Sequence, residues 1–401
     1  MAAAQGAQAE PTRELYISDP KEVLSGDPVS TSIDAWGHIE PGPQIEAAGT
    51  AVGHPITSLA VDGRTTLLGT AGGGLFRLGK GKPKPLMAAK DQVITALLPQ
   101  GKDVLAAVAP KATVFRVAQS TGRSKPFVKL KAQYVWSIAA SKTRTLLATG
   151  EPGQVVAVDG KGRTEIWFDS TESHLRAMIR HPQRGWIVGG GQKGIVYQLT
   201  GNKRARALYD SEFDEVTAFA IDGQNGDLFA SFVSAKTAGK PIPERWIGPT
   251  KGDKKASTGA GPAKRPPFKG SEVVRIRRSG QVEVLWSSST EGAMDLAFKG
   301  NRLYFSTGTE KDGRARIYAI DVKDRDRLSL WARLDPPLAP KMVETANGLV
   351  VGTAPNGEAF RIGPRRQSRA TYLSVEQDLA RTAQVGRRGL DGADHDGLSP
   401  K

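Results

Sequence analysis

Apolar residues fall in short runs along this chain, and the runs return in the same order about every 40 residues. Each unit opens with an apolar run that carries small or hydroxyl residues, and a second apolar run, a Gly-rich turn, a third run and a fourth run follow. The first runs of five successive units are residues 56–59, 94–97, 135–138, 175–178 and 216–219. Their short length, β-branched residues and Gly/Pro punctuation indicate strands rather than helices.

A unit of about 40 residues with four strands is typical of one blade of a β-propeller. We therefore predict an all-β chain, a seven-bladed β-propeller of four-stranded antiparallel blades over residues 54–375. Ala370–Leu373 is expected to form the outermost strand of the seventh blade. Propellers avoid exposed edges by pairing a strand from one end of the chain with the blade at the other end. In the extension 13–53, either Gln44–Ala47 or the stretch near Tyr16 and Ile17 could supply that strand.

The two ends of the chain differ from the repeats in composition. Residues 1–12 are rich in small residues and predict a flexible start, in which Ala7-Gln8-Ala9 fits an A-x-A cleavage pattern with no apolar segment before it. This favours a periplasmic or extracellular location, with a cytoplasmic one as the alternative. The polar tail 376–401 is expected to be largely disordered.

One long insertion, residues 235–270, interrupts the fifth blade between its second and third strands. It is rich in Pro, Gly and cations, so we expect a flexible loop that does not collapse onto itself. Long loops on a rigid scaffold often carry function. The candidate partner-binding residues in this loop are Arg245, Trp246, Lys254, Lys255, Lys264 and Arg265.

The chain is basic, with a net charge of +15, which favours polyanionic partners such as acidic polysaccharide, nucleic acid or an anionic membrane face. It has no basic recognition helix, RNA-binding aromatic motif or zinc finger, so specific nucleic-acid binding is not expected. It has no cysteine and no apolar run of 18 residues, which excludes disulfides and a transmembrane helix.

No catalytic motif is present, since G-x-S-x-G, H-E-x-x-H and the phosphate-binding G-x-x-x-x-G-K-S/T loop are all missing. Polar residues do precede many of the first strands, and these strands line the central channel of a propeller. The candidate ring at the channel mouth consists of His54, Asp91, Gln133, Glu172, His174, Asp214, Glu215 and Glu291. Such a ring could bind a cation, a basic peptide or a sugar. Alternatively, these residues only cap the strand starts.

The second residue of each first apolar run also follows a pattern. Thr57, Thr95 and Thr217 occupy this position in three blades, and Trp136 and Arg176 replace them in the third and fourth blades. The residues that follow are small, as crowding of seven strands around an axis requires. We interpret these positions as structural.

The sequence segments Ile56–Ala60, Gly74–Leu78 and Gly194–Leu199 resemble the repeats of the WD40-like, YVTN-type β-propellers of bacterial exported proteins. The Gly-His and terminal Trp-Asp pairs that recur in each unit of true WD40 repeats do not recur here. The resemblance implies a rigid, non-catalytic platform, commonly for protein partners, and it implies no cofactor.

Two functions follow from these observations. The first is a non-catalytic scaffold that presents a propeller face, together with the inserted loop, to a protein or an acidic polysaccharide. The alternative is a lyase or hydrolase with Ca²⁺ or another divalent cation at the channel mouth. In that case His174 is the base, and Asp91, Glu172 and Glu215 supply carboxylates.

Overall fold

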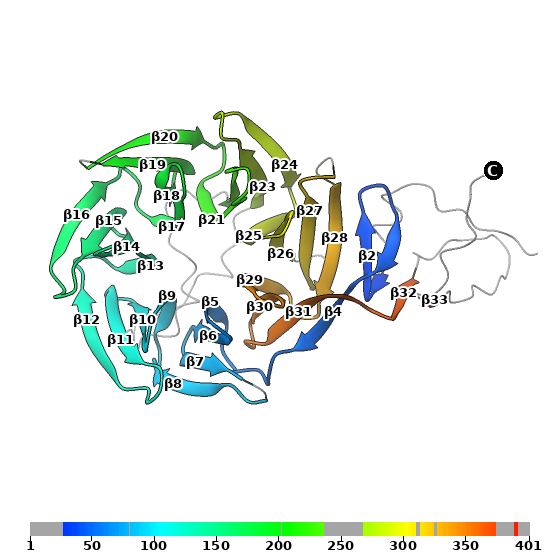
Figure 1. Ribbon diagram of the computed structural model, residues 1–401, viewed down its shortest axis with the longest axis horizontal. Helices are drawn as coiled ribbons and strands as arrows, with labels where there is room; N and C mark the ends of the chain where they lie inside the picture. Colours follow the sequence, from blue (N-terminus) through cyan, green and yellow to red (C-terminus); the bar gives the residue numbers. More distant parts are fainter. Residues whose placement is uncertain are drawn as a thin grey trace, which may run out of the picture.

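The computed structural model describes residues 27–79, 81–201, 203–235, 268–309, 313–324, 327–373 and 389–391. All regular elements in these ranges are β-strands. Figure 1 shows small sheets arranged as a ring around a central axis, with the chain passing once around it. The predicted all-β, seven-bladed propeller of four-stranded antiparallel blades is confirmed.

The first five blades are separate sheets, each made of four consecutive strands with the first strand innermost. Blade 1 contains β5 (Ile56–Asp62), β6 (Thr65–Thr70), β7 (Gly74–Leu78) and β8 (Lys84–Ala88). Blade 2 contains β9 (Val93–Gln100), β10 (Asp103–Ala109), β11 (Thr113–Ala118) and β12 (Ser124–Lys129). Blade 3 contains β13 (Tyr134–Ala140), β14 (Thr145–Gly150), β15 (Gln154–Val158) and β16 (Thr164–Asp169). Blade 4 contains β17 (Leu175–His181), β18 (Gly185–Gly190), β19 (Ile195–Gly201) and β20 (Arg204–Asp210). Blade 5 contains β21 (Glu215–Ile221), β22 (Leu228–Ala235), β23 (Phe268–Ile276) and β24 (Val282–Ser288).

The last two blades are joined into one larger sheet by a single residue pair, Gly308 with Leu338. Blade 6 contains β25 (Glu291–Lys299), β26 (Arg302–Thr309), β27 (Ala315–Asp321) and β28 (Arg327–Leu334). Blade 7 contains β29 (Leu338–Thr345), β30 (Gly348–Ala354), β31 (Ala359–Arg366) and β4 (Pro43–Ala47).

The strand that closes the ring comes from the N-terminal extension. β4 pairs antiparallel with β31, so that Ile45 lies opposite Ile362, and this confirms one of the two closing segments predicted from the sequence. The prediction that Ala370–Leu373 forms the outer strand of blade 7 is wrong. Instead, β32 (Arg369–Leu373) pairs with β1 (Asp27–Val29) and β33 (Gly389–Asp391) in a separate sheet, because β4 already occupies the outer edge of β31. The alternative segment near Tyr16 lies outside the described residues.

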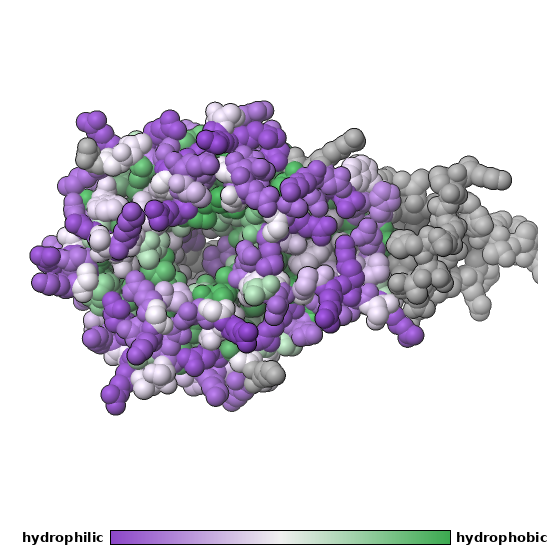
Figure 2. Space-filling model, in the orientation of Figure 1, coloured by the Kyte–Doolittle hydropathy of each residue, from purple (hydrophilic) through white to green (hydrophobic). Residues whose placement is uncertain are grey.

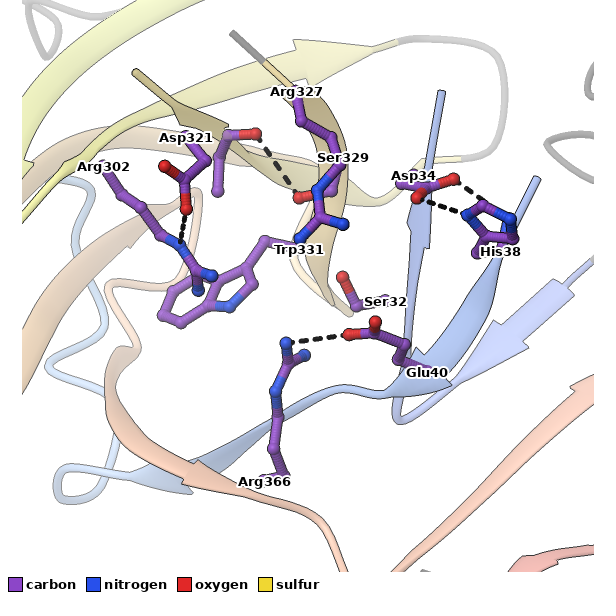
Figure 3. A pocket seen from close by; sticks show the side chains of 11 residues that line it. Ser32, Asp34, His38, Glu40, Arg302, Asp321, Arg327, Ser329, Trp331 and Arg366 are labelled. Atoms are coloured by element: carbon purple, nitrogen blue, oxygen red, sulfur yellow. Dashed lines mark hydrogen bonds and ion pairs between the residues drawn. The ribbon is translucent and has the colours of Figure 1, made fainter. Parts of the chain in front are cut away.

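A hairpin of β2 (Thr31–Asp34) and β3 (Ile39–Pro41) extends blade 6 along the outer edge of β28. Figure 3 shows the polar contacts around it, including an ion pair of Arg366 with Glu40 at 3.0 Å and one of His38 with Asp34 at 2.8 Å. Burial raises the pKa of Asp34, but hydrogen bonds from His38 and Trp36 outweigh it and leave that pKa lowered. The described part of the N-terminal extension is thus paired with both blade 6 and blade 7.

The apolar core is divided among the junctions between blades. The described residues contain seven buried clusters, and each joins two neighbouring blades, including a last one in which Ile56 of blade 1 meets Val350 of blade 7. Space at these junctions is tight, since a Cβ added to Gly69 would lie 2.5 Å from Cγ2 of Ile94 in the next blade. Each blade therefore buries its faces against its neighbours, and the stability of the ring depends on the junctions between blades.

The insertion falls where the sequence predicts it, between β22 and β23 of blade 5. Glu215 pairs with Val233, so β22 ends beside the start of the innermost strand β21, at the channel mouth. Residues 236–267 lie outside the described residues, as do 1–26, 374–388 and 392–401. The predictions for the two termini and for the six loop residues Arg245, Trp246, Lys254, Lys255, Lys264 and Arg265 therefore stay predictions.

Candidate binding site in the central channel

Every innermost strand is irregular at the same point of its register against its neighbour. In the first six blades one residue is skipped in the pairing, and in blade 7 the pairing jumps from Leu338 to Lys341. A bulged residue is unpaired, and its side chain is turned away from its place in the regular pleat. One skipped residue from each blade is included in what is named here the bulge ring; blade 7 skips Ala339 and Pro340 and contributes Pro340. The members are Thr57, Thr95, Trp136, Arg176, Thr217, Met294 and Pro340.

All seven residues of the bulge ring line one cavity of about 360 Å³ in the central channel. The space-filling view shows the opening at the centre of the ring, with apolar surface around it and a hydrophilic rim outside (Figure 2). The other lining residues are Val93, Ala109, Pro110, Tyr134, Glu215, Val233, Gly292, Ala293 and Lys341. A mainly apolar cavity of this size with a few polar groups fits a small ligand or a few residues of a partner.

Three members of the bulge ring, the threonine arc, use their hydroxyl groups to connect neighbouring blades. Thr57 Oγ1 donates to the carbonyl of Ile94 at 2.8 Å, and Thr217 Oγ1 donates to the carbonyl of Ala293 at 2.9 Å. Thr95 makes the same bond to the carbonyl of Val135. The hydroxyl donor of each is therefore used within the fold.

Trp136 and Arg176, the Trp–Arg arc, connect blades by side-chain contacts. The indole stacks on Tyr134 with ring centres 4.6 Å apart, and Cζ of Arg176 lies 3.9 Å from the Trp136 ring centre. Nε of Arg176 donates to Oε1 of Glu215 at 2.6 Å. A continuous chain of contacts thus runs from blade 3 through blade 4 to blade 5, along the cavity wall.

His174 supports this series of contacts by accepting a hydrogen bond from the Trp136 indole. Nε1 of Trp136 donates to Nδ1 of His174 at 3.2 Å, which requires that nitrogen to be unprotonated. Burial, followed by the nearby Arg176 charge, lowers the pKa of His174, although Glu151 and Glu215 act in the opposite direction. The imidazole is therefore held in its neutral form as a hydrogen-bond acceptor.

Two carboxylates of the predicted mouth ring are used to hold turns and strands together. Oε2 of Glu172 accepts the backbone N–H groups of Gln192 at 2.9 Å and Lys193 at 2.8 Å, and burial raises its pKa despite these bonds. Glu291 accepts the hydroxyl of Thr307 at 2.9 Å and pairs with Arg316. Both side chains are almost fully buried.

The structure does not gather the remaining mouth residues around one point. Asp214 binds the hydroxyl of Ser234, His54 packs on the turn at Gly72–Gly73, and Asp91 and Gln133 are exposed. Of the eight predicted residues, only Glu215 lines the cavity. Within the described ranges, no three His, Asp or Glu side chains lie close enough together to hold a metal ion.

The cavity is lined by four large side chains that were not predicted as a site, those of Tyr134, Trp136, Arg176 and Lys341. One sequence signal could have identified two of them, because Trp136 and Arg176 break a position otherwise held by threonine. The large side chains of Trp136 and Arg176 occupy a position near the axis that threonine holds in other blades, and both line the cavity.

Comparisons with known proteins show the fold and nothing finer. No family model and no curated protein matches the sequence. The WD40 repeats of RRP9 superpose with a TM-score of 0.58 at 9% identity, covering 80% of this chain and 99% of theirs. The extracellular domain of a hybrid two-component system from B. thetaiotaomicron gives 0.55 at 11% identity, covering 80% of this chain and 39% of that one. The protein is thus a β-propeller, similar in fold to WD40 propellers and to bacterial extracellular propellers.

The described residues form no helix, and therefore none that could cross a membrane.

Proposed function

We propose that this propeller is a non-catalytic recognition protein that holds part of a protein partner in its central channel. The observation that carries the proposal is the cavity of about 360 Å³ to which all seven inner strands contribute, with Trp136 and Arg176 in its wall. Pockets that bind through burial combine apolar walls with a few placed polar groups, and this cavity has that composition.

The apolar wall favours a protein partner over an acidic polysaccharide. Val93, Pro110, Val233 and Met294 offer surface to an apolar side chain and no hydrogen bonds to a sugar hydroxyl. Arg176 covers the Trp136 ring, so the face it covers cannot stack on a sugar.

The alternative, a cation-dependent lyase or hydrolase, has less support. Glu172 is occupied by backbone N–H groups, Asp91 is exposed outside the cavity lining, and His174 accepts a hydrogen bond from Trp136. Adding Ca²⁺, Mn²⁺ or EDTA in a thermal-shift experiment tests it, since a cation that raised the melting temperature would favour the enzyme.

We further propose that the protein acts outside the cytoplasm, as the WD40-like exported propellers do. The support is the Ala-rich start and the extracellular propeller among the structural neighbours. Cell fractionation of the source organism tests this, and recovery only in the cytosol would contradict it.

Photo-crosslinking from the channel tests the recognition function. A benzoylphenylalanine at Val233, which lines the cavity, should crosslink a protein partner in extracts of the source organism. The same probe at Ile166, which is 41% exposed on the outermost strand of blade 3, serves as the control. We expect a crosslink from Val233 that Trp136→Ala abolishes. A crosslink from Ile166 alone, or none from Val233, would show that the channel is not the binding surface.

A further inference from the structure

Arg176 has hydrogen-bond donors that no other described residue accepts. Its guanidinium carries five N–H groups, and the one on Nε is bound to Glu215. Among the described residues, the two terminal nitrogens have no hydrogen-bond partner, and the residue lines the cavity with its side chain 20% exposed. Four donors therefore remain for water or a ligand.

The guanidinium is also held in place. Glu215 fixes one edge at 2.6 Å, and the Trp136 ring supports its face at 3.9 Å. A planar fork held in this way loses little freedom when it binds, and its geometry matches a carboxylate through two parallel hydrogen bonds.

The charges around the cavity favour an anion. Arg176 and Lys341 are the cations among its lining residues, and Glu215 is the only carboxylate among them. Nζ of Lys341 lies 3.8 Å from Oδ2 of Asp295, a carboxyl group outside the lining with which it forms an ion pair. Since Lys341 is paired with Asp295, Arg176 is the cation of the lining with hydrogen-bond donors available to a ligand with a negative charge.

The rest of the wall would receive an apolar group. Val93 and Pro110 from blade 2, Val233 from blade 5, and Met294 and Pro340 from blades 6 and 7 line the same cavity as the guanidinium. Their burial by an apolar body would add to the carboxylate bond.

We propose that the cavity binds a carboxylate carried on an apolar body, with the carboxylate on Arg176 and the body against the apolar wall. Such a group occurs at the C-terminus of a protein that ends in a large apolar residue, and also in small free organic acids. The inference deepens the proposed recognition function by naming what the channel recognises.

Isothermal titration of the full chain tests this with acetyl-Gly-Gly-Leu as the free acid, the same peptide as its C-terminal amide, and 4-methylpentanoate. The corresponding peptides ending in Phe and Ile are titrated in parallel. We expect the free-acid peptides to bind and the amides to bind at least about tenfold more weakly, because a charged hydrogen bond is lost. A peptide that binds more tightly than 4-methylpentanoate identifies a chain terminus as the source, and the reverse order identifies a small acid.

Arg176→Gln should weaken binding of the free acid by about ten- to a hundredfold, whereas Arg163→Gln should leave it unchanged. Arg163 lies in blade 3 away from the cavity, paired with Asp159 and 78% exposed, so it is a matched control. Should Arg176→Gln fail to fold, Arg176→Lys retains the positive charge but removes the planar fork that binds a carboxylate through two hydrogen bonds, and a weaker affinity is again expected. Equal binding of acid and amide, no binding of any acid, or binding of trigalacturonate alone would overturn the inference. In the first two cases a Val233 crosslink would still leave the recognition function standing.

Discussion

The threonine arc and the Trp–Arg arc occupy the same bulged position in different blades, yet they differ in what they leave free. Thr57, Thr95 and Thr217 each donate their only hydroxyl hydrogen to a carbonyl of the next blade. Trp136 and Arg176 also connect blades, but they leave guanidinium donors facing a cavity. The same strand bulge therefore connects blades in the threonine arc and also presents donors to the cavity in the Trp–Arg arc. This difference indicates that binding occurs at the Trp–Arg arc.

The largest effect should come from removing the threonine connections together. The variant Thr57→Val/Thr95→Val/Thr217→Val keeps the shape of each side chain but removes three hydrogen bonds between blades. At about 1 kcal/mol each, the free energy of unfolding should fall by about 3 kcal/mol in urea denaturation. No loss of stability would mean that the threonines are not structural and that the comparison fails.

A smaller effect is expected from Trp136→Phe in the other arc. The ring remains, but the bond from Nε1 to His174 is lost, and the contact with Arg176 weakens. The free energy of unfolding should fall by about 1 kcal/mol. Trp36→Phe is the control, because Trp36 is 56% exposed and should tolerate the change. Equal losses in the two variants would argue that the His174 bond contributes nothing.

The smallest effect should be a pH dependence that comes from His174. Its pKa is lowered by burial and by Arg176, so the unfolded chain takes up a proton at a higher pH than the folded one. The stability contributed by neutral His174 is complete above its ordinary pKa of about 6.5 and is lost as the pH falls through its folded pKa. Glu151 and Glu215, which face the same imidazole, oppose the shift.

Urea unfolding of the wild type and of His174→Asn at pH 7.5, 6.5 and 5.5 isolates this contribution. The variant cannot titrate at this position, so the wild type should lose stability relative to it as the pH falls. A difference that stays constant across the three pH values would show that His174 keeps its ordinary pKa.

The repeats predicted the blades well because each strand is a local pattern. The runs at 56–59 and 94–97 lie at or near the starts of β5 and β9. The insertion predicted at 235–270 connects β22 and β23, although β22 includes Ala235 and β23 begins at Phe268. The outer strand of blade 7 was predicted incorrectly, since Ala370–Leu373 has strand character but pairs elsewhere. Which strand fills an edge depends on a competition between distant segments, and a local pattern carries no information about it.

The site was less predictable because polarity does not show where a side chain points. Glu172 and Glu291 look like mouth residues in the sequence, yet both are buried in bonds within their own blades. Trp136 and Arg176 lie near the start of an inner strand, where regular alternation gives no reason to expect a cavity. The bulge turns them toward the axis, and it depends on pairing with the second strand of the same blade.

The sequence by itself determined the strands of the first six blades, their number per blade and their order, since these follow from the periodicity of apolar residues and from turn chemistry. Only the tertiary structure decided that Trp136, Arg176 and Glu215, which come from three blades, share one wall of a cavity. The physical reason is the closure of the propeller ring. Side chains about 40 residues apart become neighbours only when the seven junctions pack and β4 completes the ring.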